Sequence, residues 1–88
     1  MSWRIEVKPA AEKQYLRLDK PTRRRIKEAL RDLQDATRPL QHPRLRPLTG
    51  KLQGDCRVRV GGWRVLLTPD RESQVLYVYA IVPRGDAY

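Results

Sequence analysis

The sequence has one cysteine, one histidine and no phenylalanine among its 88 residues. A single cysteine excludes an internal disulfide, and one Cys with one His gives no cluster that could bind zinc. The longest apolar run, residues 75–82, is far shorter than the ~20 residues of a transmembrane helix. The first residues lack the apolar stretch of a signal peptide. We therefore expect a soluble cytoplasmic protein with no membrane partner, no metal and no cofactor.

Acidic residues are also scarce, with ten Asp and Glu against nineteen Lys and Arg, which gives a net charge of +9. A domain this basic is typical of proteins that bind a polyanion or an acidic protein. The length allows one small domain, residues 1–88, with a modest core. The sequence also lacks a phosphate-binding glycine loop, a carboxylate pair suited to glycosidic chemistry and a nucleophile–base pair.

Hydrophobic periodicity predicts an α+β fold, a twisted, mainly antiparallel sheet in the order β-α-α-β-β-β with two helices packed on one face. Trp3, Ile5 and Val7 alternate with polar residues and are expected to face the core. The predicted elements, in chain order, are a strand (3–7), helices (9–18 and 21–36), a Pro- and Gly-rich connector (37–55), a hairpin (56–68), a turn (69–73) and a central strand (75–82).

The hairpin is the most informative segment. Gly61-Gly62 predicts a two-residue turn, which pairs Arg59 with Arg64 and Val58 with Val65. Because side chains alternate along a strand, Arg57, Arg59 and Arg64 share one face and the apolar residues share the other. Like charges placed directly opposite each other destabilise a sheet. Either an anion binds between these arginines or they are solvated and splay outward.

The second predicted helix is amphipathic. Its apolar stripe is formed by Ile26, Ala29, Leu30 and Leu33. Arg24, Lys27 and Arg31 lie away from that stripe, and they form either an RNA-binding surface or the solvated side of the helix. Lys51, in the connector, is a further candidate for RNA contact.

The element order and three separated segments resemble the RelE/ParE superfamily of bacterial toxins, the toxic partners of type II toxin–antitoxin pairs. The segments are Leu48–Gly50, Cys56–Leu66 and Arg84–Tyr88, and residues 11–19 followed by Pro21 fit as well. The resemblance spans essentially the whole chain. RelE-type members cut mRNA in the decoding site of a translating ribosome, whereas ParE-type members poison DNA gyrase. We expect the RelE-like branch, hence an endoribonuclease that inhibits translation.

The resemblance also implies site residues, since the active surface of RelE-type toxins is a set of basic residues on the sheet with a tyrosine near the C-terminus. The matching positions are Arg57, Arg59, Arg64, Arg84 and Tyr88. The implied reaction is metal-independent attack of a ribose 2′-hydroxyl on the adjacent phosphate, which yields a 2′,3′-cyclic phosphate. Arginines suit phosphate binding but stay charged, so Tyr88 is the candidate for proton transfer. The best-known RelE-type toxins carry lysines where this chain has Arg57 and Arg59, so a lysine acid–base role does not transfer.

Two other functions compete with the nuclease. The first is a gyrase poison without nuclease activity. The second is a basic RNA-binding module without chemistry, which is the weakest because Trp63 falls on the apolar face of the hairpin. The expected partners are the ribosome, mRNA and a cognate acidic antitoxin. The antitoxin is expected to wrap the sheet and helices and to fold as it binds, as a helix laid in a groove.

Overall fold

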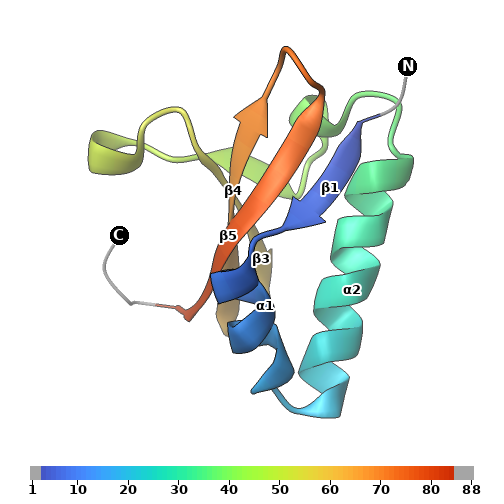
Figure 1. Cartoon of the computed structure of the whole chain (residues 1–88), viewed down its shortest axis with the longest axis vertical. Coiled ribbons are helices and arrows are strands. Elements are labelled where there is room, and N and C mark those ends of the chain that lie inside the picture. Colours follow the sequence, from blue (N-terminus) through green and yellow to red (C-terminus); the bar gives the residue numbers. More distant parts are fainter. Residues whose placement is uncertain (1–2, 85–88) are drawn as a thin grey trace.

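The computed structural model describes residues 3–84, which form a five-stranded mixed sheet with two helices on one face (Figure 1). The strand order is β1-β5-β4-β3-β2, and only β1 and β5 pair in parallel. The elements are β1 (Arg4–Val7), α1 (Pro9–Leu16), α2 (Lys20–Asp35), η1 (Pro39–Gln41), β2 (Leu45–Pro47), η2 (Gly50–Leu52), β3 (Cys56–Val60), β4 (Trp63–Asp70) and β5 (Val75–Pro83). The α+β class and the mainly antiparallel sheet are confirmed.

Local signals determine where the two helices begin. Pro9 occupies the first turn of α1, where its missing N–H costs nothing. Asp19 caps α2, because its carboxylate accepts the Thr22 backbone N–H at 3.3 Å and the Thr22 hydroxyl at 2.6 Å. These hydrogen bonds lower the pKa of Asp19. Helix α1 ends at Leu16, two residues before the predicted end, and α2 lies within one residue of its predicted bounds.

The core lies between the helices and the sheet. The apolar stripe of α2 buries Ile26, Ala29 and Leu33 completely, against the inward side chains of β3 and β4 such as Val58 and Val65. Burying each large aliphatic side chain contributes about 1.5–3 kcal/mol to stability. Leu30, on the same stripe, is half-buried.

Val7 does not face the core as predicted, since 44% of it is exposed. Its strand, β1, is at the edge of the sheet, and Val7 lies where the two helices leave a groove. Trp3 and Ile5, the other predicted core residues of this strand, do pack against the core.

Two predicted boundaries are wrong. The connector 37–55 contains a short strand, β2, which pairs with β3 and makes the sheet one strand wider. Strand β4 continues through Asp70, so the turn comprises residues 71–74 rather than 69–73. The Asp70 carboxylate causes this later turn, because its Oδ1 accepts the backbone N–H groups of Glu72 and Ser73 at 3.1 and 3.2 Å.

Candidate functional site

Three arginines lie on the face of the sheet opposite the helices. The hairpin register is confirmed: Arg59 pairs with Arg64, Val58 with Val65, and Arg57 with Leu66. The neighbouring valines point to the helices, so the alternation of the strands directs the arginines to the other face. This face is defined here as the arginine face, and its members are Arg57, Arg59 and Arg64. Arg57 and Arg64 are half-buried, whereas Arg59 is exposed.

The turn of the hairpin depends on glycine. Gly61 has a φ of +58°, in the left-handed region that side chains rarely adopt, and Gly62 completes the turn. The end of β5 runs beside this turn, because the Arg84 backbone N–H donates to the Gly62 carbonyl at 2.7 Å. Arg84 is therefore next to the hairpin, and it is exposed. Tyr88 lies outside the described residues.

Two arginines that sequence reasoning missed lie beside the arginine face. Arg46 on β2 pairs directly with Arg57 on β3, and Arg44 immediately precedes β2. Together with Pro43, Arg57 and Arg59, they line an open pocket of about 460 Å³. We call this pocket the basic pocket. Its signal in the sequence was the alternation Arg44-Leu45-Arg46, which is too short to predict a strand with any specificity.

A polar cluster stands at the start of β3. The Asp55 carboxylate accepts the Tyr79 hydroxyl at 2.8 Å and the Thr68 hydroxyl at 3.0 Å. Tyr79 is the unpaired residue of a β-bulge in β5. Leu66 pairs with Ala80 and the next residue, Leu67, pairs with Val78, so Tyr79 has no partner in β4. Burial, followed by the bond to the Asp55 carboxylate, raises the pKa of Tyr79 strongly. The cluster ties the end of the connector to β4 and β5.

The residue after Asp55 is Cys56, at the start of β3. Cys56 packs against the core, and burial raises the pKa of its thiol. Lys51 lies on η2 and is exposed. In Figure 1 the turn at residues 50–52 projects from the side of the sheet away from α2.

The basic residues of α2 lie in the other layer of the molecule. Arg24, Lys27 and Arg31 are exposed on this helix, which packs on the face of the sheet opposite Arg57, Arg59 and Arg64. The fold therefore does not bring the helix cations and the arginine face together. They form a separate basic surface.

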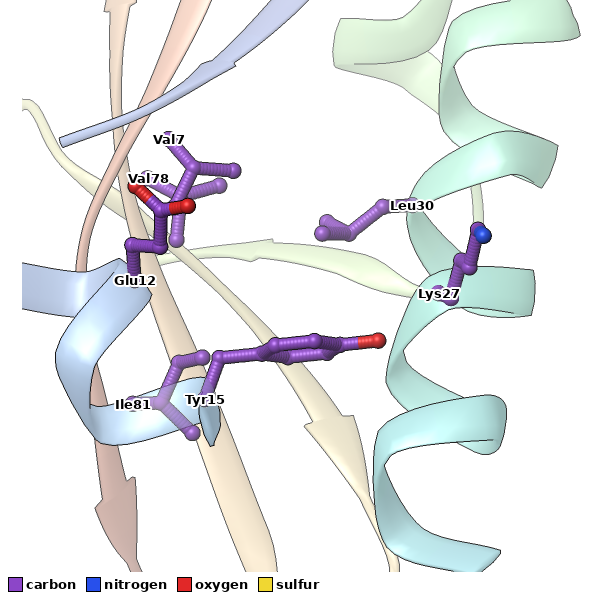
Figure 2. Close-up of a pocket in the computed structure, with 7 residues that line it drawn as sticks. All are labelled: Val7, Glu12, Tyr15, Lys27, Leu30, Val78 and Ile81. Carbon is purple, nitrogen blue, oxygen red and sulfur yellow. The ribbon is translucent and has the colours of Figure 1, made fainter. Parts of the chain in front are cut away.

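A second pocket, mainly apolar, lies between the helices and has a volume of about 450 Å³ (Figure 2). Its lining residues are Val7, Glu12, Tyr15, Lys27, Leu30, Val78 and Ile81. The Tyr15 ring extends from α1 toward α2, and its hydroxyl donates to the Arg23 carbonyl at 3.3 Å. Glu12 and Lys27 bring opposite charges to the walls of this groove. We call this pocket the interhelix groove.

Residues 3–84 contain no group of three or more His, Cys, Asp or Glu side chains placed to hold a metal ion. Within the same range, neither helix has the length and hydropathy needed to cross a bilayer.

Comparisons with known proteins identify a family and other proteins with this fold. Residues 5–88 match the family model for the ParE toxin of the type II toxin–antitoxin system parDE. No curated protein sequence matches the chain. A crystal structure of the toxin–antitoxin complex RelBE2 from Mycobacterium tuberculosis has a chain that superposes with a TM-score of 0.80 at 19% identity, covering 96% of this chain and 100% of that one.

Two further solved structures have the same fold. In the RelE–RelB complex from the archaeon Pyrococcus horikoshii, a chain superposes with a TM-score of 0.76 at 25% identity, covering 99% of this chain and 100% of that one. A YoeB/ParE toxin from Agrobacterium tumefaciens has a TM-score of 0.74 at 17% identity, covering 92% of this chain and 98% of that one. Both the sequence match and the structural matches extend over nearly the whole chain.

Proposed function

This chain belongs to the ParE toxin family of type II toxin–antitoxin systems, and from that premise we propose that its toxic activity is cleavage of mRNA on the ribosome. The resemblance of its hairpin and C-terminal motifs to RelE-type toxins favours this activity, as does the similarity of its fold to the RelE chain of the Pyrococcus horikoshii complex. The substrate is then a translated message, and the site of action is the cytoplasm.

The observation that carries the proposal is the set of guanidinium groups on one face of the sheet. Arg59 and Arg64 are paired across the hairpin, Arg57 is on the same face, and Arg84 adjoins the turn. A cluster of cations on one face attracts an anionic substrate such as an RNA backbone. Guanidinium groups bind phosphate oxygens in a forked geometry, which suits a backbone phosphate of RNA.

The reaction divides into tasks that these residues can perform. The ribose 2′-oxygen attacks the adjacent phosphorus, the bond from phosphorus to the 5′-oxygen breaks, and the products are a 2′,3′-cyclic phosphate and a 5′-hydroxyl. Arg64 and Arg84 hold the scissile phosphate, while Arg57 and Arg59 clamp the strand and stabilise the charge that develops on the phosphorane. Arginine stays charged at any working pH, so proton transfer falls to Tyr88. None of these steps needs a metal ion.

Induced expression followed by mapping of transcript 5′ ends tests the nuclease. We expect new 5′ ends in phase with the reading frame, and we expect Arg64→Ala to lower the cleavage rate about 10²–10³-fold, the usual loss of one donor to transition-state charge. Arg17→Gln is the matched control, because it removes one exposed cation from the helix layer. If Arg64→Ala and Tyr88→Phe both left growth arrest at wild-type strength, the proposal would be wrong.

Membership of this toxin family implies an antitoxin partner, and we propose that the antitoxin binds in the interhelix groove. An amphipathic helix with acidic residues would place apolar side chains against Leu30 and Val78 and its carboxylates near the basic residues of α2. Leu30→Glu is expected to weaken antitoxin binding at least tenfold. Leu16→Glu serves as its control, since Leu16 is 61% exposed and lies outside the groove. If the two variants bound the antitoxin with equal affinity, the interhelix groove would be rejected as its binding site.

The helix cations and Lys51 are proposed RNA contacts outside the arginine face. We assign Arg24, Lys27 and Arg31 to contact with ribosomal RNA rather than with the scissile phosphate, because they project from the helix layer. The double substitution Arg24→Gln/Arg31→Gln should weaken ribosome binding and flatten its salt dependence.

A gyrase poison is the second candidate, and the match to the ParE toxin family model favours it. The two functions separate in one experiment that follows translation and DNA integrity after induction. The nuclease stops translation first and leaves the chromosome intact. A gyrase poison breaks DNA while transcripts stay whole.

A further inference from the structure

The basic pocket contains more arginines than the proposed cleavage reaction uses. Arg44 and Arg46 are exposed on β2 and just before it, and with Arg57 and Arg59 they line the same 460 Å³ hollow. We propose that this pocket binds a second backbone phosphate of the RNA strand, next to the scissile phosphate. The inference rests on the proposed nuclease for the identity of the strand, and it assigns Arg44 and Arg46 as binding residues.

The geometry of the sheet sets the distance between the two phosphates. Neighbouring strands lie about 4.8 Å apart, so β2 and β4 are about 10 Å apart. Arg64 on β4 and Arg46 on β2 lie on the same face, with Arg57 and Arg59 on the strand between them. A single strand of RNA that crosses β4, β3 and β2 in turn would therefore meet cations at each step. Arg57 and Arg59, on the middle strand, can contact either phosphate.

The charge of the pocket favours an anion strongly. Every charged residue that lines it is an arginine. Arg46 and Arg57 are directly opposed across the β2–β3 pair, so they repel each other in the free protein. Arg44 Nη1 lies 4.0 Å from Asp32 Oδ2 at the surface, and an exposed pair of that length contributes little. A phosphate replaces this weak contact with charge-assisted forked hydrogen bonds.

Binding to a short single-stranded RNA with 2′-O-methyl groups, which block the attack, tests the pocket. The dissociation constant of the full chain is measured by fluorescence anisotropy over a range of salt concentrations. Loss of the second phosphate in Arg44→Gln/Arg46→Gln should reduce the slope of log K against log salt by about 0.7, the contribution of one phosphate on a single strand. The ratio of wild-type to variant affinity should therefore grow about fivefold when the salt concentration falls from 1 M to 0.1 M.

Two matched variants make the result specific. Arg4→Gln/Arg17→Gln removes the same charge from exposed positions outside the pocket, so it should keep the wild-type slope. Arg44→Lys/Arg46→Lys keeps the charge and should retain most of the slope. The proposal is overturned if the glutamine variant keeps the wild-type slope, if the control loses as much, or if the lysine variant loses as much as the glutamine variant.

Failure of the pocket and failure of the nuclease give different results. If the wild-type protein leaves transcripts uncut, the proposed nuclease activity is wrong. The anisotropy slopes still test whether the basic pocket binds a phosphate. If transcripts are cut in frame while the three variants show equal slopes, the nuclease stands and the second phosphate site is rejected.

Discussion

Arg46→Gln should stabilise the folded protein although it weakens RNA binding. Arg46 is exposed on the edge strand β2 and pairs directly with Arg57 on β3. The substitution removes one of two like charges and keeps most of the side-chain stem. We therefore expect the free energy of unfolding to rise, most of all at low salt.

The magnitude follows from the spacing of the strands. Directly opposed Cβ atoms lie about 5 Å apart, and two guanidinium groups that keep this spacing in water repel by about 0.8 kcal/mol. Screening over a Debye length of about 30 Å leaves about 0.7 kcal/mol at 0.01 M salt. At 1 M salt the Debye length is about 3 Å, and about 0.2 kcal/mol remains. The expected rise in Tm is therefore about 3–6 °C at low salt and about 1 °C at high salt.

Thermal and urea unfolding at the two salt concentrations measure this effect. Arg17→Gln is the control, because it lowers the net charge equally from the end of α1, in the helix layer. Subtracting its shift removes the contribution of general repulsion in a chain of charge +9. If Arg46→Gln gives no more stability than Arg17→Gln at 0.01 M salt, or the same gain at both salt concentrations, then repulsion between Arg46 and Arg57 is not the cause.

Three further perturbations probe the scaffold of the site. The raised pKa of Tyr79 means that its contribution to stability is complete below the unfolded pKa of about 10 and is lost as the pH rises above it, so Tyr79→Phe should flatten the fall in unfolding free energy above pH 10. Tyr79→Phe should also cost about 1.5–3 kcal/mol near pH 7, measured by urea unfolding, because it removes the hydrogen bond to the charged Asp55. Gly61→Ala should cost about 1–2 kcal/mol, since alanine is strained at a φ of +58°, and an unchanged Tm would contradict the turn. Cys56 should react with iodoacetamide more slowly than a free thiol at pH 8.5, because burial raises its pKa, and equal rates would show that the thiol is exposed.

The hairpin shows how much of the candidate site the sequence can predict. Its register depends on a two-residue turn, and the faces follow from strict alternation, so both are local properties of residues 56–68. The helix bounds depend on equally local signals, a proline at the first turn and the Asp19 cap. The position of Arg57, Arg59 and Arg64 on one face therefore follows from the sequence without any tertiary contact.

The basic pocket could not be predicted in this way. Strand β2 has three residues, Leu45–Pro47, and three residues carry too little periodicity to distinguish a strand from a loop. Its pairing with β3 depends on the closure of the intervening loop and on burial of Leu45 in the core. Only that pairing places Arg44 and Arg46 beside Arg57.

The hydrogen bond between Asp55 and Tyr79 also depends on tertiary structure and could not be predicted from the sequence. It joins residues 24 positions apart through an irregularity in β5, and nothing local in either segment indicates the other. The exposure of Val7 likewise follows from its position on an edge strand beside the interhelix groove.

The sequence alone determined the hairpin, the two helices, the excess of positive charge and the common face of three arginines, because each of these arises from neighbours along the chain. The tertiary structure decided which cations lie together. It placed Arg46 of β2 and the preceding Arg44 beside the arginine face, and it placed the cations of α2 in the opposite layer. Strand pairing and helix packing join residues that are distant in sequence, and their free energy depends on burial and charge in the assembled sheet.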